Sequence, residues 1–412
     1  MEAEYDNKNK YFTRMTLTKS HEKQIIETLN IFIIFEYFFG IFRFERVNEE
    51  LREPNWKKKV LSFCITSTCA ISFVAYSVIT LNIVMRATMR EAIYINLTCI
   101  TTMLLQFCSS ALSSTFFFNF TNIRIITTLA NLDVMLQIED YKNFYKKCLF
   151  TTYKYVTVVF ITQVTLSIID GFTMYLGWAV PAAFLDFSQR LTILTFCKYV
   201  DLLRRRLKII NNYLKAFTDE CEKETITVFT LRSRTNKTTQ AINFIGHASD
   251  NNTKIRDLSR MYGMIGQACS MVNKIFNFLI LTILFNSFIF IITIMWISLV
   301  MYRNSSDNLG LYINVVLSFF CWISYLLFIT ITCQRLVSLR NKTKILLNKI
   351  VMNYDLPTTM RDQAKAFMQL VEAFPLRIHV YDMFSIDISL MLKFISVATT
   401  YLIVVIQIFN FF

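Results

Sequence analysis

The chain has 412 residues, of which 54% are hydrophobic and 15% aromatic, and its mean hydropathy is +0.42. Soluble domains contain about 45–50% apolar residues, so this composition argues against a soluble globular protein and for helices that cross a bilayer. The net charge of +14 would suggest nucleic-acid binding in a soluble protein. Here the basic residues lie between apolar runs, where cytoplasmic loops explain them, and we expect no nucleic-acid partner.

The N-terminal segment, residues 1–59, is expected in the cytoplasm. Its first 28 residues are polar and charged, which predicts a poorly ordered tail and no signal peptide. The apolar run 29–44 is short for a span and contains Glu36, which favours a re-entrant or interfacial helix. A genuine span over these residues is the alternative, and it would raise the number of spans to eight.

Seven longer apolar runs follow, and each is long enough to cross a bilayer as a helix. The first six form an expected ligand-binding bundle over residues 60–334, and the seventh is the last segment of the chain. The connections after the first, third and fifth runs are short, whereas the others are longer and basic. The predicted spans are 60–84, 92–119, 148–176, 180–203, 273–301, 311–334 and 386–412.

Lys and Arg are unevenly distributed among the connections. Eleven lie in residues 1–59, four in 120–147, fourteen in 198–274 and eight in 335–377, whereas the other three connections hold three in total. Because cytoplasmic loops of membrane proteins are enriched in these residues, the N-terminus is predicted inside the cell and the C-terminus outside. This topology is opposite to that of G-protein-coupled receptors, and we expect a multi-pass protein of the plasma membrane.

Apolar residues recur at helical spacing after the sixth span. The pattern runs through residues 336–350 and again through 358–374, with Pro357 at the start of the second helix and Pro375 just after its end. We therefore expect spans four to six to extend into the cytoplasm and residues 335–385 to form a packed helical anchor. Separate amphipathic helices lying on the bilayer are the alternative.

The last span places polar side chains in helical register. Ser385 or Asp387 can cap its N-terminus by accepting hydrogen bonds from otherwise unpaired amides. A polar amide such as that of Gln407 costs free energy in a membrane unless it meets a partner or water, and a pore would supply water. A hydrogen bond to a neighbouring helix, or contact with the interface, is the alternative. The residues on this side of the helix are Thr400, Val404, Gln407, Ile408 and Phe411.

Thr400 and Tyr401, followed by five aliphatic residues and Gln407, resemble the signature of insect gustatory receptors. The resemblance implies an all-α protein with seven spans, and a tetramer, homomeric or heteromeric with related receptors, around the last helix. It also implies a tastant-gated, non-selective cation channel of sensory neurons that needs no cofactor. Gln407 and Ile408 match the positions of the outer gate, where the family has phenylalanine in place of Ile408. Odorant receptors share the topology but lack this pattern.

The same resemblance implies a ligand pocket in the outer half of the earlier helices. Asp186 and Arg190 are four residues apart and can pair on one helix face, either for a ligand or as a structural ion pair. Leu402 departs from the corresponding residue of sugar receptors, so bitter plant compounds are expected, with a fructose-type sugar or another nutrient as the alternative. The polar and aromatic candidates are Tyr94, Gln106, Asp170, Trp178, Asp186, Gln189, Arg190, Trp296, Asn314 and Trp322.

Two other protein classes fit the sequence less well than a channel. The three histidines have no metal-ligand spacing, and the chain contains neither a phosphate-binding loop nor a nucleophile elbow, so we expect no enzyme and no metal site. A transporter would favour repeated halves with broken helices, and the sequence has no internal repeat of this kind. A transporter or a non-channel receptor remains the alternative from another class.

Overall fold

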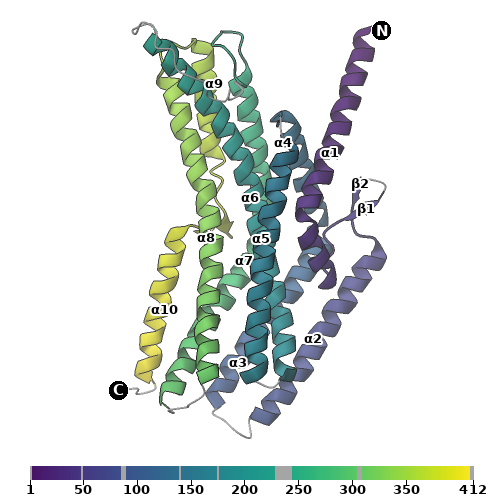
Figure 1. The fold of residues 1–412 in the computed structure, drawn as a ribbon, viewed down its shortest axis with the longest axis vertical. Helices are drawn as coiled ribbons and strands as arrows, with labels where there is room; N and C mark the ends of the chain where they lie inside the picture. The colour runs from purple at the N-terminus through teal and green to yellow at the C-terminus, as the bar shows by residue number, and fades with distance from the viewer. Residues whose placement is uncertain are drawn as a thin grey trace.

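In the computed structural model, long helices run side by side, and α1 begins at the end of the bundle opposite to the one that α10 approaches (Figure 1). The structure describes residues 2–47, 50–84, 90–138, 141–173, 176–227, 244–303 and 309–408. The helices are α1 (Glu2–Phe38), α2 (Trp56–Val84), α3 (Arg90–Leu112), α4 (Asn119–Met135), α5 (Tyr141–Thr173), α6 (Leu176–Thr227), α7 (Lys254–Arg303), α8 (Leu309–Met352), α9 (Thr358–Ala373) and α10 (Ile388–Ile408).

The seven predicted spans fall in α2, α3, α5, α6, α7, α8 and α10, so the all-α membrane fold is confirmed. Within the described residues, length and composition alone mark a membrane-crossing stretch in α2, α5, α7 and α8. In α10, the marked apolar stretch is shorter, Ile388–Tyr401. The span in α6 contains Asp186, Arg190 and Lys198, which lower its mean hydropathy.

The predicted disordered tail is wrong, because α1 begins at Glu2 and runs without a break to Phe38. Ile25, Leu29 and Phe32 are buried at helical spacing and belong to the main hydrophobic core. This stripe packs α1 against α4 and α5. Tertiary packing therefore stabilises the second half of α1, which continues a helix that begins in a polar segment.

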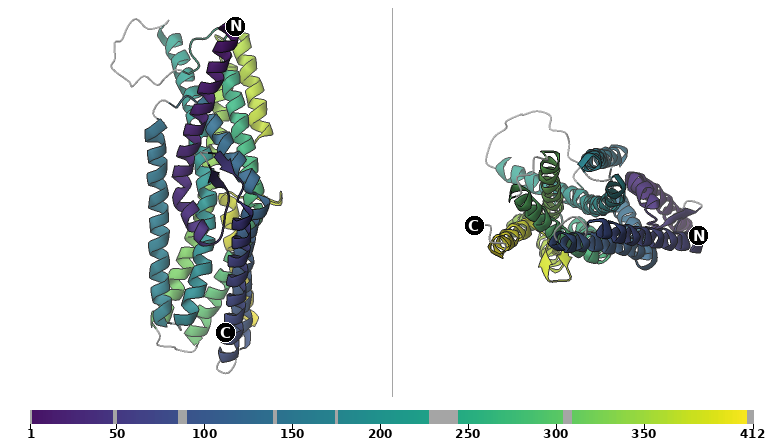
Figure 2. Two further views of the ribbon diagram at one scale, coloured as in Figure 1. Left: turned by 90° about the vertical axis from the view of Figure 1, so that its right-hand side faces the viewer. Right: turned by 90° about the horizontal axis from the view of Figure 1, so that it is seen from below.

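The apolar end of α1 enters the bundle, and the chain then turns back. The helix stops partway along the long axis (Figures 1 and 2). Gly40 adopts a φ of +73°, which favours glycine, and reverses the chain. An unpredicted antiparallel hairpin follows, with β1 (Glu45–Val47) paired to β2 (Glu50–Arg52), and leads into α2.

The predicted second span does not continue as one regular α-helix. It ends as α3 at Leu112, passes through a π-helical turn, η1 (Ser113–Phe117), and continues as α4. The Phe42 amide donates a hydrogen bond to the Thr115 hydroxyl at 3.0 Å, so this turn meets the chain just after α1. Helix α4 lies in what was expected to be a loop, and its inner face packs against α1 and α7.

The packed helical anchor is present at the end of the bundle where α1 begins (Figure 1). Helices α6, α7 and α8 extend beyond their predicted spans, and α9 packs against α7 and α8. The Tyr262 hydroxyl donates to the Phe374 carbonyl at 2.8 Å, which joins α7 to the end of α9. A short hairpin of β3 (His379–Val380) and β4 (Phe384–Ser385) then leads to α10. The buried residues of α9 are Met360, Ala364, Phe367 and Val371.

Candidate functional site

Helix α10 begins with a side-chain cap. The Asp387 carboxylate accepts hydrogen bonds from the backbone amides of Ser389 at 3.0 Å and Leu390 at 3.2 Å. The Ser385 hydroxyl donates to the other carboxylate oxygen at 2.9 Å. Asp387 is therefore the N-cap, one of the two residues predicted for this role, and it fixes where the helix starts.

One face of α10 packs against α7 and α8. Met391 and Ala398 are buried on this face. Phe288 of α7 makes edge contacts with Phe394 and Tyr401, with ring centroids 5.8 and 5.5 Å apart. These aromatic contacts fix the rotation of α10 about its axis, because residues 394, 398 and 401 share one side of a helix.

The opposite face of α10 is exposed in the single chain. Thr400, Val404 and Gln407 are all exposed and lie on this face, as their spacing predicts. The Thr400 hydroxyl donates to the carbonyl of Ser396 in its own helix, at 3.0 Å. Gln407 has no hydrogen bond to any residue that the structure describes. The Ile408 side chain and Phe411 lie outside the described part of the structure.

A polar seam joins α3, α6 and α7 inside the membrane bundle. The Thr102 hydroxyl donates to the Asn286 side-chain oxygen at 2.7 Å, and the Asn286 amide donates to the Gln189 oxygen at 2.8 Å. Gln106 lies one turn after Thr102 and is 1% exposed, and neither of its amide atoms has a hydrogen-bond partner among the residues that the structure describes. One turn further along α3, the hydroxyls of Ser110 and Thr192 are 3.3 Å apart.

The predicted ion pair between Asp186 and Arg190 is present on α6, with a distance of 2.5 Å between their charged atoms. Arg190 also lies over the Tyr325 ring of α8, 5.0 Å from its centroid, and one of its nitrogens is 3.3 Å from the Tyr325 hydroxyl. One oxygen of Asp186 and the Nε of Arg190 are buried without a hydrogen-bond partner in the described part of the chain. A purely structural ion pair in a low-dielectric interior would be expected to have all its polar atoms hydrogen-bonded. The unpartnered atoms of Asp186 and Arg190 therefore favour a contact with a ligand.

The structure brings only some of the predicted ligand residues together. Gln106 and Gln189 lie at the seam, and Asp186 and Arg190 face Tyr325. Trp322 instead packs in a separate apolar cluster with Phe290, Phe319 and Ile294. The following predicted residues lie in helices, but their side chains are outside the described part of the structure: Tyr94, Asp170, Trp178, Trp296 and Asn314.

Two residues at these positions were not predicted. Asn286 is an amide in the middle of an apolar span. Polar side chains inside membrane helices are costly and often functional, and this argument, which identified Gln407, would also have identified Asn286. Tyr325 resembles any other aromatic residue of a membrane helix, and no signal in the sequence distinguishes it.

Comparison with known proteins agrees with this architecture. The family model described as 7tm chemosensory receptor matches residues 29–408. The insect olfactory receptor OR5 from Machilis hrabei matches with a TM-score of 0.64 and 15% identity, over 94% of this chain and 100% of that one. Its complex with eugenol matches with a TM-score of 0.58 and 14% identity, over 96% and 99%.

No curated protein matches the chain in sequence. At such low identity the two solved structures establish the fold alone, whereas the family model spans most of the chain. The chain therefore belongs to the 7tm chemosensory receptor family.

Proposed function

We propose that this protein is a gustatory receptor that acts as a ligand-gated, non-selective cation channel in the plasma membrane. The observation that carries the proposal is the exposed polar face of α10, formed by Ser396, Thr400 and Gln407. A glutamine that faced lipid would lose its hydrogen bonds to water, at a cost in free energy. Several copies of α10 around a water-filled pore, four by the family resemblance, would keep this face hydrated.

The contacts of α7 offer a route from ligand to pore. Asn286 belongs to the polar seam, and Phe288, two residues later, touches Phe394 and Tyr401 of α10. A ligand that displaced the Asn286–Gln189 hydrogen bond would shift α7 where it packs on the pore helix. Such a ligand opens the channel only if it binds the open arrangement more tightly than the closed one.

The ligand class is proposed from two features of the chain. The amides and hydroxyls of the seam lie on α3, α6 and α7, and two of these helices, α3 and α6, also carry the rings of Phe107 and Phe184, whose centroids are 5.8 Å apart. Such a site suits a mostly apolar molecule with a few polar groups. The residue after the Thr-Tyr pair is Leu402, which differs from the residue that sugar receptors have at this position. We therefore propose bitter plant compounds as the ligands, ahead of a fructose-type sugar or another nutrient.

An olfactory role is the second candidate, because the fold matches an insect olfactory receptor, one structure of which contains eugenol. The Thr400–Tyr401…Gln407 pattern favours the gustatory role, since it resembles the gustatory signature.

The test is a whole-cell recording from heterologous cells that express this chain alone, with surface expression measured in parallel. The panel contains plant alkaloids, plant glycosides, sugars and eugenol. An inward current evoked by alkaloids or glycosides supports the proposal, and a current evoked only by eugenol would favour the olfactory role. Uptake of a ligand without any current, at normal surface expression, would contradict the channel and favour a transporter.

The variant Phe288→Ala tests the route through α7. It should weaken the coupling between ligand and current, whereas Phe278→Ala, which removes an exposed ring of the same helix, should leave it unchanged. An unchanged dose–response curve in Phe288→Ala would contradict the proposed route.

A further inference from the structure

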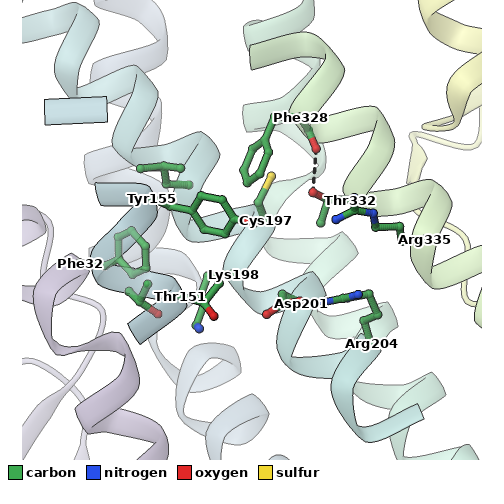
Figure 3. A pocket seen from close by; sticks show the side chains of 12 residues that line it. Phe32, Thr151, Tyr155, Cys197, Lys198, Asp201, Arg204, Phe328, Thr332 and Arg335 are labelled. Carbon is green, nitrogen blue, oxygen red and sulfur yellow. Dashed lines mark hydrogen bonds and ion pairs between the residues drawn. The ribbon is translucent and has the colours of Figure 1, made fainter. Parts of the chain in front are cut away.

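A cavity of about 50 Å³ lies between α1, α5, α6 and α8, away from the polar seam and from α10. Figure 3 shows its lining, in which basic side chains gather on one side and aromatic rings on the other. The basic residues are Lys198, Arg204 and Arg335, and the aromatic ones are Phe32, Tyr155 and Phe328.

The positive charge around the cavity exceeds what the protein itself neutralises. Asp201 is the one carboxylate in the lining, and it already accepts hydrogen bonds from Arg204 at 2.9 Å and Arg205 at 2.7 Å. The Lys198 ammonium is buried and donates to the Cys148 carbonyl at 2.9 Å, which leaves two of its protons for another acceptor. Arg335 is exposed at the rim, and no ion pair joins it to the described residues.

The cavity lies where the predicted spans end. Arg204 and Arg335 directly follow the predicted ends of the fourth and sixth spans, on the side of the bundle with the basic connections. Beside the cavity, the outer surface of α5 exposes Phe150, Val158 and Ile161, as expected for a surface in contact with lipid chains. A lipid next to α5 could therefore reach the basic residues with its headgroup while its chains remain in the bilayer.

We propose that this cavity binds the phosphate of an anionic phospholipid of the cytoplasmic leaflet. The phosphate oxygens accept hydrogen bonds from Lys198 and Arg335, and the glycerol and acyl chains lie along Tyr155 and Phe328. Basic pockets between membrane helices on the cytoplasmic side suit such headgroups, and charge-assisted hydrogen bonds to phosphate are strong. A bound lipid would connect α5 to α6 and α8 on the membrane side of the anchor.

The test is native mass spectrometry of the full-length protein, purified in detergent and incubated with phosphatidic acid or phosphatidylcholine. We expect preferential retention of phosphatidic acid, and about a fivefold loss of it for each basic residue removed, in Lys198→Met and in Arg335→Gln. Lys342→Gln, an exposed residue of α8 two turns further along, is the matched control and should retain the lipid like the unchanged protein.

Each outcome decides the proposal. Equal retention of the two lipids, or retention unaffected by Arg335→Gln, would overturn it. Arg335 is exposed, so this variant should fold even if Lys198→Met does not. Competition by inorganic phosphate at concentrations comparable to the lipid would assign the site to free phosphate and overturn the lipid as its occupant.

Discussion

The Glu36 carboxylate holds the Arg43 guanidinium in a two-point ion pair, with N–O distances of 2.7 and 2.8 Å, and both side chains are 3% exposed. The two residues flank the reversal at Gly40, so the pair closes the turn that follows α1. The Thr195 hydroxyl of α6 also donates to Glu36, at 3.1 Å, and Arg43 lies 5.3 Å from the centre of the Phe276 ring of α7. A single buried pair therefore joins the end of α1 to α6 and α7.

Removing one charge of this pair should destabilise the protein strongly. In Glu36→Gln the buried Arg43 loses its partner, and we expect a cost of about 3–5 kcal/mol. Arg52→Gln is the control, because its ion pair with Glu50 is more than half exposed on both sides and should contribute about 0–1 kcal/mol. Thermal unfolding of the detergent-solubilised protein measures both, and equal unfolding midpoints would contradict the structural role of the pair.

Two glycines of α7 should respond differently to alanine. A Cβ at Gly266 would lie 2.8 Å from the ring of Phe374 and 3.0 Å from its Cβ, so α9 would have to move, at about 1–3 kcal/mol. At Gly263 the nearest atom is 3.6 Å away, and Gly263→Ala should gain up to about 1 kcal/mol of helix propensity. Unfolding midpoints that shift in the same direction would show that α9 does not approach α7 this closely.

Gln106 should limit stability and favour ligand binding. Gln106→Met keeps the side-chain volume but removes two buried polar atoms without partners, so we expect a gain of about 1–3 kcal/mol together with lower ligand sensitivity. Gln189→Met is the matched variant: it breaks the hydrogen bond with Asn286 and should lower both stability and sensitivity. Thermal unfolding and dose–response recordings decide this. An unchanged dose–response curve in Gln106→Met would exclude Gln106 from the ligand site.

His21 should make the anchor end of the bundle sensitive to acid. Burial lowers the pKa of its imidazole from 6.5, the Asp133 carboxylate opposes this effect, and the Arg206 guanidinium adds to it. Because the folded pKa is below the unfolded one, the unfolded state takes up the proton first. The stabilising contribution is therefore present above pH 6.5 and is lost as the pH falls below this value toward the folded pKa.

The variant His21→Gln isolates this contribution. Between about pH 7.5 and pH 5.5, the unfolding midpoint should fall more in the unchanged protein than in the variant, because only the former carries the histidine. Equal slopes of the midpoint against pH would contradict the assignment to His21.

Local patterns in the sequence predicted the features that depend on neighbours in the chain. The apolar residues at helical spacing in 358–374, with Pro357 and Pro375 at the two ends, predicted α9. Asp387, the N-cap of α10, was one of the two residues predicted for that role. The spacing of Asp186 and Arg190 predicted their ion pair. Each of these rests on residues no more than a few turns apart, for which helix geometry fixes the distance.

Features that depend on distant residues could not be predicted in this way. The first half of α1 is polar and its sequence predicts no helix, whereas the second half packs against α4 and α5, which lie far away in the sequence. Asn286 is 97 residues from Gln189, and Tyr325 is 135 residues from Arg190, so no spacing rule connects them. The helix α4 was missed for the same reason, since its buried face is completed by α1 and α7.

If the exposed face of α10 lines a cation pathway, as we propose, substitutions of Gln407 should change ion permeation. Ligand-evoked whole-cell currents are compared in the unchanged protein, Gln407→Ala, Gln407→Lys and the control Ser324→Ala, which removes an exposed hydroxyl from α8. At equal surface expression, Gln407→Ala should alter the relative cation permeabilities. Gln407→Lys should nearly abolish the inward current, because a ring of positive charge repels cations. The proposal predicts no change in the control. Normal current and selectivity in both Gln407 variants would contradict it.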